Sequence, residues 1–382
     1  IMTSLCFLAV VIFGLFSLSK LPIDLYPDID TNTIMVMTAY PGASASDIEN
    51  NVTRPLENTL NAVSNLKHIT SRSSENMSLI TLEFEFGNDI DVLTNDVRDK
   101  LDMVSSQLPD DVENKLRELA AQETNTLAKL LYETYFKNQD EALRLNRPSC
   151  QDTGLLQFFV RCGSEFPLIL NLEGVLREAV KQATIEAPLR HNAVETFDEY
   201  NTGLNIGKDA PSVFWEIVSG DRCEIDAYMA GGGCTLPGHA MVLMPGDGYE
   251  GVVKYVLDVL TEYGINACPP LLVGVGVATS VETAALLSKK ALMRPLGQHN
   301  PNERAAGLER LLEEGINRIG FGPQGMTGNA SVLGVHVENS ARHPSAIGVG
   351  VSTGCWSHRR AHIIFEKDLS YTVTSHKGAK FE

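Results

Sequence analysis

The sequence has few cysteines, few tryptophans and no excess of basic residues, and each shortage excludes a class of protein. Its 382 residues include seven cysteines and two tryptophans. No two cysteines form a CxxC pair and no close Cys–Cys–His–His cluster occurs, which argues against a zinc ribbon and a thioredoxin-type redox centre. The formal net charge of −17 argues against a broad nucleic-acid-binding surface, because such a surface needs clustered Lys and Arg.

The remaining composition is that of an ordinary folded protein. Hydrophobic residues make up 43% of the chain and charged residues 21%, which excludes general disorder, collagen and disulfide-stapled miniproteins. The length predicts two or three domains. Because the cysteines are widely spaced, they fit free thiols or a metal cluster in a reducing compartment better than disulfides.

The first residues predict a membrane helix. Residues 1–19 carry no charge, and at about 1.5 Å per residue they span roughly 28 Å, close to the hydrocarbon thickness of a bilayer. A signal-like segment or a buried core helix is the alternative, although no basic start or cleavage site is clear. Because the chain opens with Ile1 inside this apolar run, we expect it to be a piece of a longer reading frame.

Residues 20–109 have the pattern of a small α/β domain. Apolar side chains alternate with polar ones from Ser78 to Phe86, as in a half-buried strand, and recur at helical spacing from Asp89 to Gln107. The expected elements are a strand at Thr33–Tyr40, a helix at Ser44–Val63, a hairpin at Lys67–Ser73 and Ser78–Phe86, and a helix at Asp89–Gln107. This order predicts an α/β sandwich that stops before its last strand.

Residues 110–382 predict a larger mixed α/β domain. Periodic apolar residues predict helices that end at Asn146-Arg147-Pro148. They also predict a helix at Glu173–Ala183 and a further helix around Leu308 to Ile316. Thr279 and Glu282 have the spacing of a capping box that opens a helix through Leu292. The β-branched runs Leu271–Val277 and Ala346–Ser352 are the clearest expected strands.

Four motifs in the first part of the chain are specific. They are LPIDLYPDI (21–29), YPGAS (40–44), VTRPLE (52–57) and NDVRDKL (95–101). With them, residues 1 to about 112 resemble the resistance–nodulation–division (RND) efflux permeases. The resemblance implies a first transmembrane helix and part of a ferredoxin-like porter subdomain. We expect no transport from this fragment, because its one membrane helix has no ionisable residue of the kind that carries protons.

Six motifs further along the chain form a second set. They are NRPSCQDTG (146–154), APLRHN (187–192), MAGGGC (229–234), NACPP (266–270), GPQG (322–325) and STGCW (352–356). With them, residues of about 110–382 resemble the α subunits of L(+)-tartrate dehydratases and the N-terminal part of class I iron–sulfur fumarases. Because a Pro-Asp-Asp-Val stretch at 109–112 fits both resemblances, the chain is expected to be an artefactual or engineered chimera joined there. A natural fusion, or a chimera that misfolds, is the alternative.

The second resemblance implies a four-iron, four-sulfur (4Fe–4S) cluster held by Cys150, Cys268 and Cys355. Each of the three lies in a turn-like context beside Pro or Gly, where free backbone N–H groups can bond cluster sulfurs. One iron would then lack a protein ligand and act as a Lewis acid on the hydroxyl that leaves the substrate. Cys234 is a weaker fourth candidate.

Polar residues near these cysteines are implied to bind a small dicarboxylate. Arg190 is suited to clamp a carboxylate and Gln151 to donate through its amide, while Gly232 lets the backbone approach a ligand closely. Asp152 and His343 are implied to assist near the reacting carbon. For Cys6, Cys162 and Cys223 we expect buried structural roles.

One competing motif is rejected. Gly274-Val275-Gly276-Val277-Ala278-Thr279 follows an apolar run like a dinucleotide fingerprint. Its third glycine is replaced by Thr279, and no acidic residue stands near the expected ribose position. A glycine-dense turn from strand to helix is the better interpretation.

The sequence therefore predicts a hydro-lyase subunit that dehydrates L(+)-tartrate to oxaloacetate and needs a β subunit, in a heterotetramer of two α and two β subunits. A class I fumarate hydratase α subunit is the first alternative, and an inactive RND fragment the second. We expect a cytoplasmic location for the dehydratase part, inner-membrane targeting by the N-terminal segment, membrane contact only through residues 1–19, and no nucleic-acid partner.

Overall fold

The computed structural model describes residues 33–39, 44–49, 53–54, 66–74, 77–84, 107–145, 147–187 and 189–377. The chain divides into two compact units, Ile1–Gly87 and Asn88–Glu382. The expected membrane helix at 1–19 and the expected helix at 89–107 lie outside the described residues. Among the residues that are described, no helix is long and apolar enough to cross a membrane. The expected domain boundary at residues 109 and 110 stays a prediction.

The first unit contains a three-stranded antiparallel sheet with the order β1-β3-β2. Its described elements are β1 (Thr33–Ala39), α2 (Ala45–Ile48), β2 (Leu66–Ser74) and β3 (Met77–Phe84). The hairpin and the first strand agree with the sequence pattern. Because β3 pairs with both other strands, β1 and β2 are parallel to each other across it, which is the arrangement of a strand–helix–strand–strand unit in a ferredoxin-like fold.

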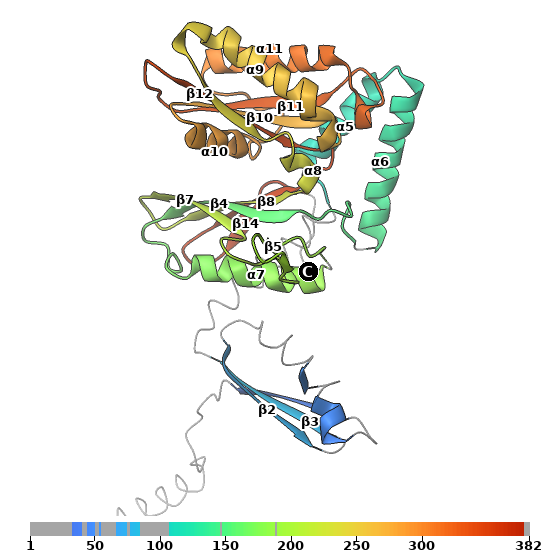
Figure 1. Cartoon of the computed structure of the whole chain (residues 1–382), viewed down its shortest axis with the longest axis vertical. Coiled ribbons are helices and arrows are strands. Elements are labelled where there is room, and N and C mark those ends of the chain that lie inside the picture. The colour runs from blue at the N-terminus through green and yellow to red at the C-terminus, as the bar shows by residue number, and fades with distance from the viewer. Residues whose placement is uncertain are drawn as a thin grey trace, which may run out of the picture. The chain divides into compact units, whose positions relative to one another are not determined.

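The second unit has five layers that alternate between helices and sheets (Figure 1). A four-stranded sheet has the order β11-β10-β12-β9, and a five-stranded sheet has the order β14-β13-β8-β4-β7. Helices α9 and α11 cover the outer face of the first sheet, α10 lies between the two sheets, and α7 covers the outer face of the second. The mixed α/β fold that the sequence predicts is confirmed here.

The bounds of the elements follow the sequence pattern closely. The helices are α5 (Asp110–Gln122), α6 (Thr126–Leu145), α7 (Leu172–Glu186), α8 (Gly232–Thr235), α9 (Gly248–Tyr263), α10 (Val281–Ala291) and α11 (Glu303–Ile319), with 3-10 turns at Pro245–Asp247, Gly264–Ala267 and Pro323–Gly325. The strands are β4 (Leu155–Gly163), β5 (Val194–Glu195), β6 (Tyr200–Asn201), β7 (Ser212–Val218), β8 (Cys223–Ala230), β9 (His239–Leu243), β10 (Leu271–Ala278), β11 (Val332–Asn339), β12 (Ile347–Gly354), β13 (Arg360–Phe365) and β14 (Tyr371–Val373).

The central strand β10 is buried along its whole length, as expected for a strand covered on both faces. It pairs in parallel with β11 and antiparallel with β12. Its glycines face α10: a Cβ at Gly276 would lie 2.0 Å from the carbonyl oxygen of Ala284. The Gly274–Thr279 segment is therefore a close strand–helix contact, in agreement with the rejection of a dinucleotide fingerprint.

One predicted cap is wrong. Helix α10 begins after Ser280, which is its N-cap residue, and the Ser280 hydroxyl lies 3.0 Å from that of Thr283. Thr279 instead accepts a hydrogen bond from the backbone N–H of His343 at 3.0 Å. The Thr279 hydroxyl, which the capping-box pattern assigned to the helix, is therefore bonded to the loop before β12 instead.

Candidate active site

Three cysteines from distant segments converge because the residues beside them are bonded to one another. The backbone N–H of Trp356, which follows Cys355, donates to the carbonyl of Cys268 at 3.1 Å. The hydroxyl of Ser149, which precedes Cys150, lies 3.1 Å from that of Ser357. The three segments that carry Cys150, Cys268 and Cys355 are therefore brought together by these contacts.

The loop that carries Cys268 is fixed from both sides. Cys268 ends a 3-10 turn with φ 54° and ψ 70°, a left-handed conformation that few residues other than glycine adopt. The hydroxyl of Tyr135 on α6 donates to the carbonyl of Pro269 at 3.2 Å, and its ring stacks on Trp356 with centroids 4.1 Å apart. Cys268 itself is an exposed residue of this loop.

A fourth thiol joins the three. Cys234 on α8 shares a hydrogen bond with Cys355, and that bond, followed by the nearby charges of Arg359 and Lys289, lowers the pKa of Cys234 to about 7 against the opposing effect of burial. The hydroxyl of Thr353 donates to the carbonyl of Cys234 at 2.8 Å and fixes this short helix. The hydrogen bond to Cys234 and burial raise the pKa of Cys355.

The electrostatic environment of the thiols depends on how deeply each is buried. Burial raises the pKa of Cys268, and the neighbouring Cys234, Cys150 and Asp152 raise it further.

Among the residues that the structure describes, no three His, Cys, Asp or Glu side chains lie close enough to hold a single metal ion. A 4Fe–4S cluster binds each thiolate at a different iron, so its ligands lie farther apart than the ligands of one ion.

Asp152 is the centre of a hydrogen-bond network beside the thiols. One carboxylate oxygen accepts from the backbone N–H of Gly232 at 2.7 Å. The other accepts from the N–H of Gly154 and the amide of Asn192, each at 3.1 Å. A Cβ at Gly231 would lie 3.2 Å from this carboxylate and 3.8 Å from the sulfur of Cys234, so the loop packs closely against both groups.

The predicted carboxylate-binding pair also lies together. The guanidinium of Arg190 donates to the side-chain oxygen of Gln151 at 3.2 Å, and the backbone N–H of Arg190 donates to the hydroxyl of Thr153 at 3.0 Å. Both Arg190 and Gln151 are exposed. Gln151 and Asp152 follow Cys150 directly in sequence, so this donor pair lies at the rim of the thiol group.

His343 is not part of this group within one chain. It lies in the exposed loop between β11 and β12 and bonds to Thr279, which follows the last residue of β10. Cys268 precedes the first residues of the same strand. Eight strand residues separate the two ends, roughly 25 Å at ~3.3 Å per residue. The expectation that Asp152 and His343 flank one reacting carbon is therefore not met by a single chain.

The structural cysteines lie as predicted where the structure describes them. Cys162 and Cys223 are fully buried on the paired strands β4 and β8, in the core that α7 covers. Cys6 lies outside the described residues.

Two further residues complete the site, although sequence patterns contained little indication of them. Asn192 contacts both the carboxylate of Asp152 and the carbonyl of Gly154 at 3.0–3.1 Å. Arg359 is 2% exposed and donates to the backbone carbonyl of Asp152 at 2.7 Å. Asn192 is a polar residue of the APLRHN motif, which could have indicated a role in the site. Arg359 belongs to an Arg-Arg pair (359–360), and such a pair normally indicates an exposed surface.

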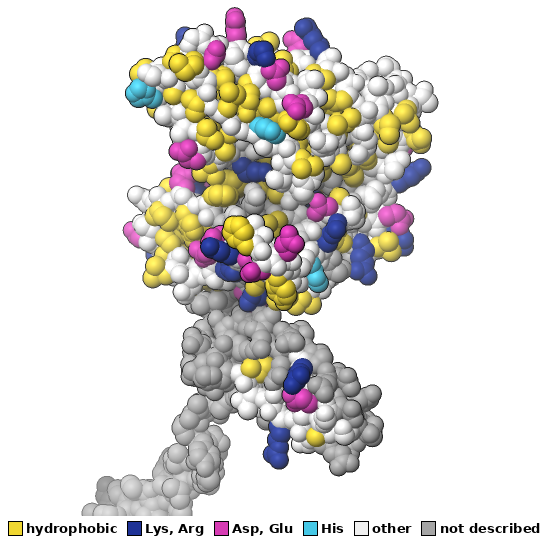
Figure 2. Space-filling model, viewed as in Figure 1, with side chains coloured by type: hydrophobic (Ala, Val, Ile, Leu, Met, Phe, Trp, Pro, Cys, Tyr) yellow, Lys and Arg dark blue, Asp and Glu magenta, His cyan; other side chains and the backbone are white. Residues whose placement is uncertain are grey.

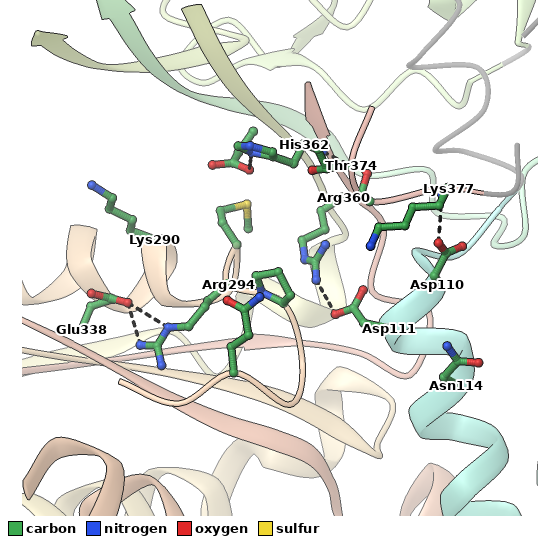
Figure 3. Close-up of a pocket in the computed structure, with 15 residues that line it drawn as sticks. Asp110, Asp111, Asn114, Lys290, Arg294, Glu338, Arg360, His362, Thr374 and Lys377 are labelled. Carbon is green, nitrogen blue, oxygen red and sulfur yellow. Dashed lines mark hydrogen bonds and ion pairs between the residues drawn. The ribbon is translucent and has the colours of Figure 1, made fainter. Parts of the chain in front are cut away.

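The large cavity in Figure 3 is a separate feature. Its volume is about 760 Å³, and three pairs of its lining residues are bonded to one another: Arg360 with Asp111, Arg294 with Glu338, and His362 with Asp226. None of the predicted site residues lines it. On the face seen in Figure 2, cationic and anionic side chains are interspersed.

Comparison with known families shows which family models match the sequence that carries these thiols. The sequence matches the family model described as fumarate hydratase (Fumerase) over residues 94–364. The chain belongs to this fumarate hydratase family. A second model, described as the AcrB/AcrD/AcrF family, matches residues 1–147, so the two resemblances predicted from the motifs are both confirmed.

Relatives in the fumarate hydratase family are close. L(+)-tartrate dehydratase subunit alpha of Escherichia coli O157:H7 is 57% identical over 288 residues, which are 75% of this chain and 95% of the relative. Proteins of the same name from Escherichia coli strain K12 and Shigella sonnei are 56% identical over the same shares. The fumarate hydratase match contains all eight predicted site residues.

Proposed function

We propose that this chain is the cluster-bearing α subunit of a hydro-lyase that removes water from L(+)-tartrate to give oxaloacetate. The observation that carries the proposal is the 57% identity to L(+)-tartrate dehydratase subunit alpha over 95% of that protein. The product of water loss is an enol, which tautomerises to the 2-oxo acid without further chemistry. The grouping of thiols, a carboxylate and an arginine in this chain supports such a reaction.

Cys150, Cys268 and Cys355 would hold the 4Fe–4S cluster. The donor set fits because the thiols come from three segments joined by short hydrogen bonds and lie beside Arg359, whose Nε and Nη1 have no partner among the described residues. When bound, the cluster would supply a Lewis acid for the departing hydroxyl. Cys234 stays the weaker ligand candidate, because a fourth thiolate would occupy the position that the substrate needs.

The exposed pair of Arg190 and Gln151 would bind a substrate carboxylate. A guanidinium donates two parallel N–H bonds to a carboxylate, and the amide of Gln151 adds a third donor. Gly232 would let the substrate approach the backbone closely, because it has no Cβ. Because both carboxylates of the substrate are ionised, these donors orient it by charge as well as by hydrogen bonds.

Asp152 would hold or move the proton that accompanies the leaving hydroxyl. Three donors fix its carboxylate, so its position is set before substrate binds. His343 remains a predicted site residue, but it cannot reach this site from the same chain. The base that takes the carbon-bound proton would come from the β subunit, so we expect the α chain alone to be inactive.

The test is co-purification of this chain with a tartrate dehydratase β subunit, followed by anaerobic cluster reconstitution. Oxaloacetate formation from L(+)-tartrate is then compared with fumarate formation from L-malate. A higher kcat/KM for L(+)-tartrate supports the proposal. A far higher kcat/KM for L-malate would replace it with the second candidate, a fumarate hydratase α subunit, which the description of the matching family favours.

A further inference from the structure

Arg359 is a buried cation with an incomplete set of partners. It is 2% exposed and lies between Cys355 and the first residue of β13. Its Nη2 donates to the carbonyl of Asp152 at 2.7 Å. Its Nε and Nη1 have no hydrogen-bond partner among the described residues, and no ion pair to a carboxylate is found for it in that part of the chain.

An unpaired buried guanidinium is unfavourable, because desolvation of a charge costs several kcal/mol unless an anion or acceptors replace the water. A native fold that keeps such a group therefore indicates an anionic partner at that place. The sulfurs of Cys234 and Cys355 are candidates, because the charge of Arg359 acts on both thiols and Arg359 follows Cys355 by four residues. The carboxylate of Asp152 is already occupied by other donors.

We propose that Arg359 is a positioning residue for the iron–sulfur cluster: its Nε and Nη1 donate to the thiolate sulfur of Cys355 or to a cluster sulfide, while its Nη2 holds the backbone of Asp152. One guanidinium thus connects the metal centre to the carboxylate that handles the proton. This inference rests on the proposed function, because it requires the cluster. N–H bonds to sulfur and a nearby positive charge both stabilise the more negative, reduced state of such a cluster.

The neighbouring residue supplies a matched control. Arg360 is also 2% exposed, but it is the first residue of β13 and pairs with Asp111 at the cavity in Figure 3. Its Nε, like that of Arg359, has no hydrogen-bond partner among the described residues. The two arginines therefore share burial and charge, and they differ in that Arg360 is paired with a carboxylate.

The experiment loads the wild-type chain and three variants, Arg359→Gln, Arg359→Lys and Arg360→Lys, with iron and sulfide under anaerobic conditions. Iron content, the midpoint potential of the cluster and its rate of bleaching in air are measured for each. We expect Arg359→Gln to lower the equilibrium constant for one-electron reduction at least tenfold, which is about 59 mV, and to speed bleaching. Arg359→Lys keeps the charge without the planar fork, so its shift should be smaller, and Arg360→Lys should match the wild type.

The outcomes separate the inference from the function on which it rests. A wild-type chain that takes up no cluster overturns both. A loaded Arg359→Gln variant with the potential and bleaching rate of the wild type overturns the inference and leaves the proposed function intact. If Arg359→Gln does not fold by circular dichroism, the folded Arg359→Lys variant decides, because an unchanged potential and bleaching rate in that variant also overturn the inference.

Discussion

Single hydrogen bonds beside each cysteine hold together three segments that lie far apart in sequence. The bond from the Trp356 N–H to the Cys268 carbonyl and the contact between Ser149 and Ser357 involve neighbours of the thiols. The thiol groups themselves therefore do not hold the segments together, except at the Cys234–Cys355 contact. Loss of one thiol should therefore affect metal binding far more than folding.

The first prediction concerns those thiols. Substitution of Cys150, Cys268 or Cys355 by Ser should abolish or sharply reduce cluster loading, because a hydroxyl is a poor ligand for iron in such clusters. Iron and sulfide content after anaerobic reconstitution measures the effect. Cys162→Ser is the control: it should load a normal cluster even if its buried position lowers stability. Full loading in all three site variants would contradict the ligand assignment.

The second prediction concerns Arg190. In the complex with the β subunit, Arg190→Lys should raise KM for L(+)-tartrate roughly 10- to 100-fold, since one charge-assisted hydrogen bond contributes ~1.5–3 kcal/mol. Arg161→Lys is the control, because Arg161 is an exposed arginine that pairs with Glu216 on the second sheet. Steady-state kinetics that give equal KM values for the two variants would exclude the clamp.

The third prediction is an acid-dependent loss of stability. Burial, with a smaller effect of Arg294, lowers the pKa of His336 to about 4. Below the unfolded pKa of about 6.5 the unfolded chain binds a proton that the native chain does not. The free energy of unfolding therefore falls as the pH drops from about 6.5 to about 4, by about 3 kcal/mol from this residue.

Urea unfolding of the apo chain at pH 7 and pH 4.5 checks this. His336→Gln should reduce the difference between the two pH values, whereas substitution of the exposed His191 by Gln should leave it unchanged. Buried His376, whose pKa is also lowered to about 4, keeps part of the effect in both variants. An identical pH difference in His336→Gln and the wild type would be inconsistent with the buried neutral imidazole.

At the scale of elements, close contact between α10 and the four-stranded sheet positions β10, the strand that follows Cys268. Gly276 and Gly350 both lie against the carbonyl of Ala284, which a Cβ would approach to 2.0 and 2.4 Å. Backbone packed this closely has no room to adjust. The glycines of β10 and β12 therefore determine the spacing between sheet and helix.

The fourth prediction follows from that contact. Gly276→Ala should lower the free energy of unfolding by about 1–3 kcal/mol or more, because an added methyl overpacks the interface. Gly307→Ala is the matched control: Gly307 lies inside α11 with open space around it, so alanine should stabilise by about 0.5–1 kcal/mol. Denaturant midpoints measure both, and equal midpoints for the two variants would rule out the proposed packing.

Sequence patterns predicted where some of these elements lie, but were less informative about which faces are buried. The apolar residues that indicate helix α6 are Leu127, Leu130, Leu131, Ala142 and Leu143. Ala142 is buried, but Leu127, Leu130 and Leu143 are about half exposed, and Tyr132 and Tyr135 are buried as well. Tyrosines score as moderately apolar, so the periodicity favoured the leucines. The motifs also did not predict where His343 lies, because its location depends on the directions of β10 and β12 in the folded sheet.

For the whole molecule, the larger unit has a core of its own. Among the described residues, its three hydrophobic clusters are built from residues between Leu108 and Phe365. The family assignment was predictable from motifs that lie wholly within this unit, and the three-thiol ligand set stays a prediction from the same motifs. Arg359 was not predictable, because its role depends on two sheets meeting around it.

The fifth prediction is that deletion of residues 1–87 leaves the larger unit folded, with a thermal midpoint within a few degrees of the full chain. Deletion through Gln122 is the control and should unfold it, because α5 contributes buried Val112 and Leu116 to the core. Circular dichroism on heating compares the three chains. A truncated 88–382 chain without a cooperative transition would refute the independence of the units.

The unequal exposure of the four thiols has a consequence for how the metal centre is assembled and lost. Cys268 is held at the surface by its left-handed turn, Cys150 is half-buried, and Cys234 and Cys355 lie inside. Iron that arrives from solvent meets Cys268 first and the inner sulfurs last. The same order applies to oxidants and chelators, so the centre should be dismantled from its outermost sulfur inward.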